Sequence, residues 1–103
     1  MPRETVPGTK ASDIPRGALA LIEVDGTRIA VANVNGTYYA FDDACTHEQC
    51  SLAEGDLEGT KVICMCHGSE FDVTTGHVLA PPARRALKLY PVRVADGILH
   101  IEV

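Results

Sequence analysis

Apolar and polar residues alternate with a period of two along much of the chain, which is the pattern of strands with one buried face. Candidate strands cover residues 18–24, 28–34 and 37–41. Between them lie Asp25-Gly26 and Asn35-Gly36, dipeptides that favour the two-residue turns of β-hairpins. We expect these three segments to form an antiparallel meander.

The C-terminal part repeats this theme, with candidate strands over 87–94 and 98–103 on either side of Asp96-Gly97. No segment has a sustained 3.6-residue period, and residues 12–15 could form one helical turn at most. The pattern therefore predicts an all-β fold, an antiparallel sandwich or partly open barrel.

The middle of the chain, residues 42–83, is different, because it is rich in Gly, Cys, Asp, Glu, His and Pro. Short strands are expected over 61–63 and 71–73, with a turn at 74–76. We interpret this segment as a loop-rich subdomain inserted into a single domain of residues 1–103. Such a segment buries little apolar surface, so a bound metal would supply part of its folding energy.

Two short motifs in this segment carry the candidate chemistry. Cys45-Thr46-His47 is followed, after sixteen residues, by Cys64-Met65-Cys66-His67. Zinc sites usually pair like ligands, as Cys-x₂₋₄-Cys followed by His-x₃₋₅-His. Here each motif mixes one thiolate with one imidazole, which favours a 2Fe–2S cluster in which two histidines replace two cysteines on one iron. A structural zinc site is the alternative.

Composition limits the other possibilities. The chain has 103 residues, 46% of them hydrophobic, which suits one modest core. A formal charge of −5 argues against binding to nucleic acid or to anionic membranes. No apolar run approaches the ~20 residues of a membrane span, and no secretory signal follows Met1. We expect a soluble, cytoplasmic protein.

The motif Cys45-x-His47, with Cys64-x-x-His67 and the following Gly68, resembles that of the Rieske 2Fe–2S proteins. The resemblance implies that Cys45 and Cys64 bind the inner iron, and His47 and His67 the outer, solvent-facing iron. The short chain is most similar to the Rieske-type ferredoxins of multicomponent aromatic-ring dioxygenases. By this resemblance the chain is not itself an enzyme. It is a monomeric one-electron carrier between a flavin-dependent reductase and a terminal oxygenase.

Some residues resemble another branch, the Rieske proteins of cytochrome bc complexes and arsenite oxidase. Their pattern implies a Cys50–Cys66 disulfide between the two cluster loops and a hydrogen bond from the Ser69 hydroxyl to a bridging sulfide. The alternatives are free buried thiols and a serine bonded to local backbone. Phe71 stands where that branch has a tyrosine. These residues leave a second function open, a Rieske subunit of a larger complex of the arsenite-oxidase or nitrite-reductase type.

Other residues are assigned smaller roles. By the same resemblance, Pro81-Pro82 forms a loop that covers the cluster. His77 and His100 have no ligand spacing, so we expect ordinary surface or edge histidines in strand-like segments.

Overall fold

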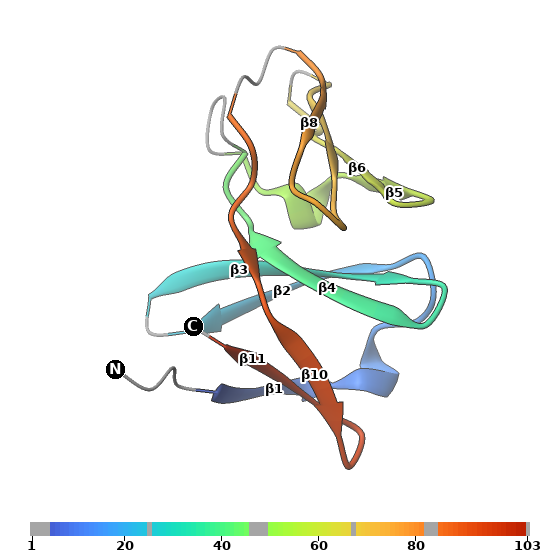
Figure 1. Ribbon diagram of the computed structural model, residues 1–103, viewed down its shortest axis with the longest axis vertical. Helices are drawn as coiled ribbons and strands as arrows, with labels where there is room; N and C mark the ends of the chain where they lie inside the picture. The colour runs from blue at the N-terminus through green and yellow to red at the C-terminus, as the bar shows by residue number, and fades with distance from the viewer. Residues whose placement is uncertain (1–4, 25, 46–49, 67, 82–84, 103) are drawn as a thin grey trace.

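The computed structural model describes residues 5–24, 26–45, 50–66, 68–81 and 85–102, and Figure 1 shows a β framework below a smaller subdomain. The first framework sheet has the order β2-β3-β4-β9. Its strands are β2 (Leu19–Val24), β3 (Thr27–Val34), β4 (Thr37–Asp42) and β9 (Leu89–Tyr90). The expected meander is confirmed, with each strand within one or two residues of its predicted bounds.

A second framework sheet has the order β1-β11-β10. It consists of β1 (Thr5–Lys10), β10 (Val92–Ala95) and β11 (Ile98–Glu102). The prediction of one strand over 87–94 was wrong, because the chain changes sheets at Pro91: β9 pairs with β4, and β10 pairs with β11. Proline has no backbone N–H to donate to a ladder, so it suits such a break.

The subdomain holds a third sheet, β5-β6-β7-β8. Its short strands are β5 (Asp56–Glu58), β6 (Lys61–Ile63), β7 (Glu70–Asp72) and β8 (Val78–Ala80). The 3₁₀ helix η2 (Leu52–Glu54) precedes it, and a second one, η1 (Ala11–Asp13), follows β1. In Figure 1 this sheet lies at one end of the molecule, away from the β10–β11 turn.

The strand periodicity divides the apolar side chains into two buried clusters. One fills the framework and includes Ile29, Val31 and Leu99. The other joins the framework to the subdomain, and it includes Phe41, Phe71 and the candidate ligands Cys45 and Cys64. Successive residues of β3 face opposite sides of the sheet and so serve both clusters.

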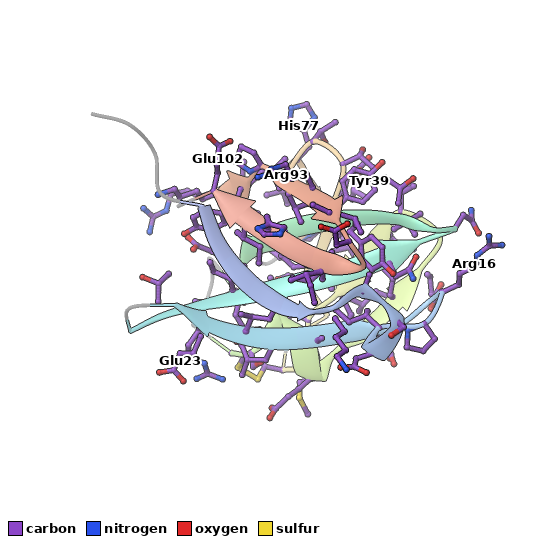
Figure 2. All side chains as sticks on the ribbon, turned by 90° about the horizontal axis from the view of Figure 1, so that it is seen from below. Arg16, Glu23, Tyr39, His77, Arg93 and Glu102 are labelled. Carbon is purple, nitrogen blue, oxygen red and sulfur yellow. A yellow bond between two sulfur atoms is a disulfide. The ribbon has the colours of Figure 1, made fainter. Side chains whose placement is uncertain are left out.

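Two of the predicted turns have left-handed backbone at both central positions. Asn35 and Gly36 have φ values of 52° and 93°, and Asp96 and Gly97 have 53° and 75°. Such turns match the right-handed twist of the paired strands. Labelled charged side chains such as Arg16 and Glu23 project outward from the framework in Figure 2. None of the helices among the described residues has the length and apolar character needed to span a bilayer.

Candidate metal centre

The two candidate thiol ligands begin loops that are closed in the same way. Cys45 follows β4, and its backbone N–H donates a hydrogen bond of 2.9 Å to the carbonyl oxygen of Cys50. Cys64 follows β6, and its N–H donates one of 2.8 Å to the carbonyl oxygen of Ser69. In both loops the partner lies five positions later, so each cysteine stands at the base of a short, closed loop.

The second loop has an additional internal constraint. Gly68 has a φ of +79°, a value that a residue with a side chain rarely adopts. Its N–H donates to the carbonyl oxygen of Cys64 at 3.1 Å. Glycine at this position therefore allows the loop to turn back on the candidate ligand.

Neither candidate ligand cysteine takes part in a disulfide, and both are buried. Cys45 is 1% exposed and Cys64 is 3% exposed. They belong to the cluster of apolar side chains that joins the subdomain to the framework. Thiolates are soft ligands suited to iron–sulfur clusters, zinc and Cu(I). The predicted imidazole ligands, His47 and His67, lie outside the described residues, as does Pro82.

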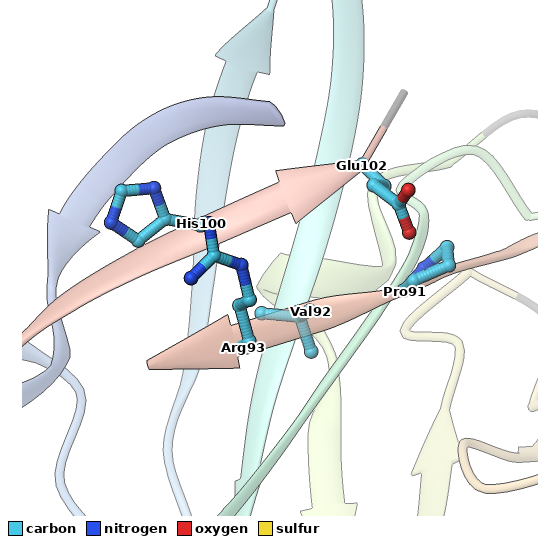
Figure 3. A pocket seen from close by; sticks show the side chains of 5 residues that line it. All are labelled: Pro91, Val92, Arg93, His100 and Glu102. Carbon is cyan, nitrogen blue, oxygen red and sulfur yellow. The ribbon is translucent and has the colours of Figure 1, made fainter. Parts of the chain in front are cut away.

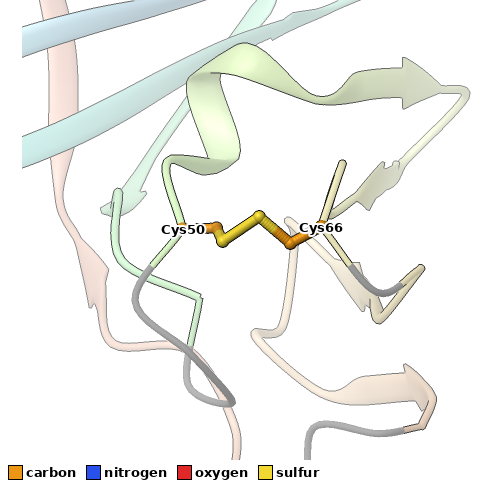
Figure 4. The surroundings of a disulfide bond; sticks show 2 residues. All are labelled: Cys50 and Cys66. Atoms are coloured by element: carbon orange, nitrogen blue, oxygen red, sulfur yellow. A yellow bond between two sulfur atoms is a disulfide. The ribbon is translucent and has the colours of Figure 1, made fainter.

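A disulfide joins the two loops (Figure 4). Cys50 and Cys66 are bonded with a Cα–Cα distance of 6.5 Å and a sequence separation of 16. Cys50 is half-buried and Cys66 is exposed. The sulfur atoms of both lie within 4.8 Å of the Cys64 sulfur. The covalent link therefore fixes the two loops to each other directly beside a candidate ligand.

The remaining residues singled out in the sequence lie in different surroundings. Ser69 is fully buried in the second loop, whereas Pro81 is exposed. His77 is exposed and precedes β8 rather than lying in a strand, so its expected place in a strand-like segment was wrong. Figure 2 shows it at the surface. His100 lies in β11 as expected.

A pocket of about 300 Å³ lies on the hairpin formed by β10 and β11, and it is lined by Pro91, Val92, Arg93, His100 and Glu102. Arg93 and His100 are cross-strand partners in β10 and β11, and Figure 3 shows their side chains next to each other. The pocket contains neither candidate ligand cysteine, so it is separate from the candidate metal centre.

Sequence reasoning missed a polar contact at the base of the first loop. Asp43 is 2% exposed, and its carboxylate accepts hydrogen bonds from the Ser51 hydroxyl at 3.0 Å and the Ala53 N–H at 2.9 Å. Its second oxygen lies 3.4 Å from the Arg28 guanidinium. The only signal in the sequence was a carboxylate two positions before the candidate ligand Cys45, and exposed carboxylates are common in such loops.

Comparison with known proteins gives concordant results. A family model described as the Rieske [2Fe-2S] domain matches residues 4–91. The chain is 39% identical over 84 residues to the ferredoxin component of naphthalene 1,2-dioxygenase/salicylate 5-hydroxylase systems from Ralstonia sp., covering 82% of this chain and 81% of that protein.

Two solved structures are similar over nearly their whole length. A Sphingomonas yanoikuyae B1 ferredoxin has a TM-score of 0.91 and 30% identity, with 97% of this chain and 99% of that chain covered. A chain in the complex of reduced oxygenase and oxidized ferredoxin in carbazole 1,9a-dioxygenase has a TM-score of 0.91 and 32% identity, with 95% and 92% covered.

Proposed function

Because the chain belongs to the Rieske [2Fe-2S] domain family, we propose that it carries single electrons from a flavin-dependent reductase to a terminal Rieske oxygenase. The chain supplies the electron-transfer component, and oxygenation of the substrate takes place on the partner. The observation that carries this proposal is a pair of buried cysteines outside any disulfide, at the bases of two loops that the Cys50–Cys66 disulfide joins.

The cofactor of this family is a Rieske-type 2Fe–2S cluster, and the described residues fit it. Cys45 and Cys64 offer two soft donors from adjacent loops, and neither is used in a disulfide. We propose that they bind one iron and that His47 and His67 bind the other. When bound, the cluster accepts and releases one electron, at about −150 to +300 mV for this ligand set.

The protein contributes burial and rigidity to this chemistry. The two thiol ligands lie in the apolar cluster that joins the subdomain to the framework, away from water. Exclusion of water and hydrogen bonds to the cluster change its reduction potential, because they stabilise the oxidised and the reduced state to different extents. The disulfide and the two closed loops keep the ligands in place while the charge changes, so little rearrangement accompanies electron transfer.

Charge is distributed unevenly along the chain. Residues 42–83 contain eight of the 14 Asp and Glu residues but only Lys61 among the 9 Lys and Arg residues. The described part of this segment exposes Glu54, Asp56 and Glu58. An acidic end favours fast encounter with a partner that carries a basic rim. We infer that both redox partners present such a rim.

An exposed apolar side chain lies at the same end. Met65, between Cys64 and Cys66, is 61% exposed. Methionine adapts its shape to different apolar surfaces, which suits a carrier that must contact two partners in turn. Among the described residues, the other large exposed apolar side chains are Leu21, Leu79 and Val94, each on a separate strand. This scattered distribution favours a free, monomeric carrier over the subunit of a larger complex.

Stopped-flow mixing tests the proposal. The cluster-loaded chain is reduced by the flavin reductase encoded beside its gene, then mixed with the terminal oxygenase, and absorption reports each cluster. We expect rapid electron transfer in both steps. The Cys64→Ser variant, which keeps the size of the side chain but removes a thiol ligand, should transfer none. The carrier function would be wrong if neither partner changed the redox state of the cluster-loaded chain faster than it changes in buffer without a partner.

A further inference from the structure

We propose that Asp43 and Arg28 together position the Cys45 loop and set the reduction potential of the cluster. The proposal rests on the function proposed above, because it takes Cys45 as a cluster ligand. Asp43 touches neither substrate nor cofactor in this account, and it acts through the loop and through its charge.

Asp43 connects three segments of the chain. Its carboxylate accepts hydrogen bonds from Ser51 and Ala53, which follow the first loop. Its backbone N–H donates to the carbonyl oxygen of Arg28 at 3.1 Å, and its own carbonyl oxygen accepts from the Leu52 N–H at 2.8 Å. One residue therefore ties the beginning of β3 to the end of β4 and to η2.

The contacts of Asp43 lie on both sides of the loop that begins at Cys45. Asp43 lies two residues before Cys45, and Ser51 directly follows Cys50, whose carbonyl oxygen accepts the Cys45 N–H bond. Ala44 and Ser51 also form an isolated bridge. Asp43 thus holds the chain on both sides of the loop, and loss of its carboxylate contacts would let the loop entry and exit separate.

Asp43 and Arg28 carry opposite charges that differ in their exposure to solvent. The Asp43 carboxylate is 2% exposed, whereas the Arg28 side chain beside it is 54% exposed. Solvent therefore screens the positive charge more than the negative one. Reduction adds a negative charge to the cluster, so the Asp43 charge opposes reduction and the Arg28 charge favours it. Neutralising either residue should shift the midpoint potential, and the two shifts should have opposite signs.

Voltammetry of purified, cluster-loaded variants tests this proposal. Asp43→Asn keeps the side-chain size and an acceptor oxygen, and we expect a midpoint above that of the wild-type protein. Arg28→Gln should lower the midpoint, and Arg28→Lys, which keeps the positive charge, should return it towards the wild-type value. Because Arg28 is half exposed, its variants should fold even if Asp43→Asn does not.

Matched controls make the same charge changes at the other end of the molecule. Asp96→Asn lies in the β10–β11 turn, where asparagine also tolerates the φ of 53°, and Arg93→Gln lies in β10. Both should leave the midpoint unchanged. Thermal unfolding provides a second readout, and we expect Asp43→Asn to lower the unfolding temperature more than Asp96→Asn does.

The outcomes separate this inference from the proposed function. If Arg28→Gln bound the cluster fully and kept the wild-type midpoint, the electrostatic role would be overturned while the carrier function stood. If Asp43→Asn bound the cluster and unfolded at the wild-type temperature, the positioning role would be overturned. A wild-type chain that held no iron–sulfur cluster would instead contradict the function proposed above.

Discussion

The backbone N–H of Cys64 donates a hydrogen bond of 2.8 Å to the carbonyl oxygen of Ser69, five positions later in the chain. The Cys45 loop is closed by the same spacing, with Cys50 as the acceptor. The two candidate ligand loops are therefore built alike, and the Cys50–Cys66 disulfide joins one to the other. Ser69, which closes one of them, is itself fully buried.

Ser69→Ala should lower the midpoint potential. We predict that the buried hydroxyl donates to a cluster sulfur, a bond that stabilises the more negative, reduced state. A hydrogen bond to a charged group contributes about 1.5–3 kcal/mol. The shift reflects the difference in this bond between the two redox states, so its upper bound is about 60–130 mV for one electron. Voltammetry measures the shift. The control is Ser12→Ala in η1 of the framework, which should leave the midpoint unchanged. An unchanged midpoint would mean that the hydroxyl bonds elsewhere.

The disulfide should contribute to stability. The Cys50→Ala/Cys66→Ala double variant should lose about 2–4 kcal/mol of unfolding free energy, because the cross-link restricts the unfolded chain. Denaturant unfolding followed by circular dichroism measures this loss. Alkylation of the denatured, metal-free protein without reductant checks the bond directly. Only Cys45 and Cys64 should react, and labelling of all 4 cysteines would show that the bond does not form.

Tyr90 should make stability fall at alkaline pH. The pKa of Tyr90 is raised from 10.0 to about 12. Burial is the larger cause, and the hydrogen bond of 2.5 Å that its hydroxyl donates to Asp42 is the second. Above pH 10 the unfolded chain loses this proton while the folded protein keeps it, so stability should decline between pH 10 and 12. Tyr90→Phe should remove this part of the decline in unfolding experiments across that range.

Absorbance titration of tyrosinate gives an independent check on Tyr90. The chain has 3 tyrosines, and the wild-type protein should show one ionisation step near pH 12 that is absent from Tyr90→Phe. Ionisation of Tyr90 near its ordinary value of 10.0 would contradict its assigned environment.

Acidic side chains on the subdomain should speed association with the redox partners. We expect the variant Glu54→Gln/Asp56→Asn/Glu58→Gln to bind its reductase about 10-fold more slowly at low ionic strength, with a weaker dependence on salt. The matched control Asp13→Asn/Glu23→Gln/Asp96→Asn removes the same number of charges from the framework and should associate at nearly the wild-type rate. Equal effects of the two variants would indicate that only net charge matters.

The sequence predicted those parts of the fold that local patterns specify. Alternation and Asx-Gly turns located the meander and the terminal hairpin, because both depend on neighbouring residues. Strand β1 was missed, since Thr5–Lys10 contains Pro7 and Gly8 and lacks apolar alternation. It forms a strand because it pairs with β11 at the other end of the chain. The four subdomain strands have only three residues each, too few to show a period; the sequence located β6 and β7 approximately and missed β5 and β8.

The sequence also singled out two described residues of the candidate centre. Spacing identified Cys45 and Cys64, and the structure places both in one buried cluster. The Asp43 contacts could not be predicted, because Arg28 and Ser51 reach this carboxylate only through the tertiary fold. A buried carboxylate and an exposed one look the same in a sequence.

Voltammetry of the wild-type protein tests the central claim most directly. A 2Fe–2S cluster bound by two cysteines and two histidines should give one reversible one-electron wave between about −150 and +300 mV. A wave near the value of about −400 mV typical of four-cysteine plant-type ferredoxins would contradict the mixed ligand set. A colourless protein with no wave would contradict the cluster itself and would favour a zinc site.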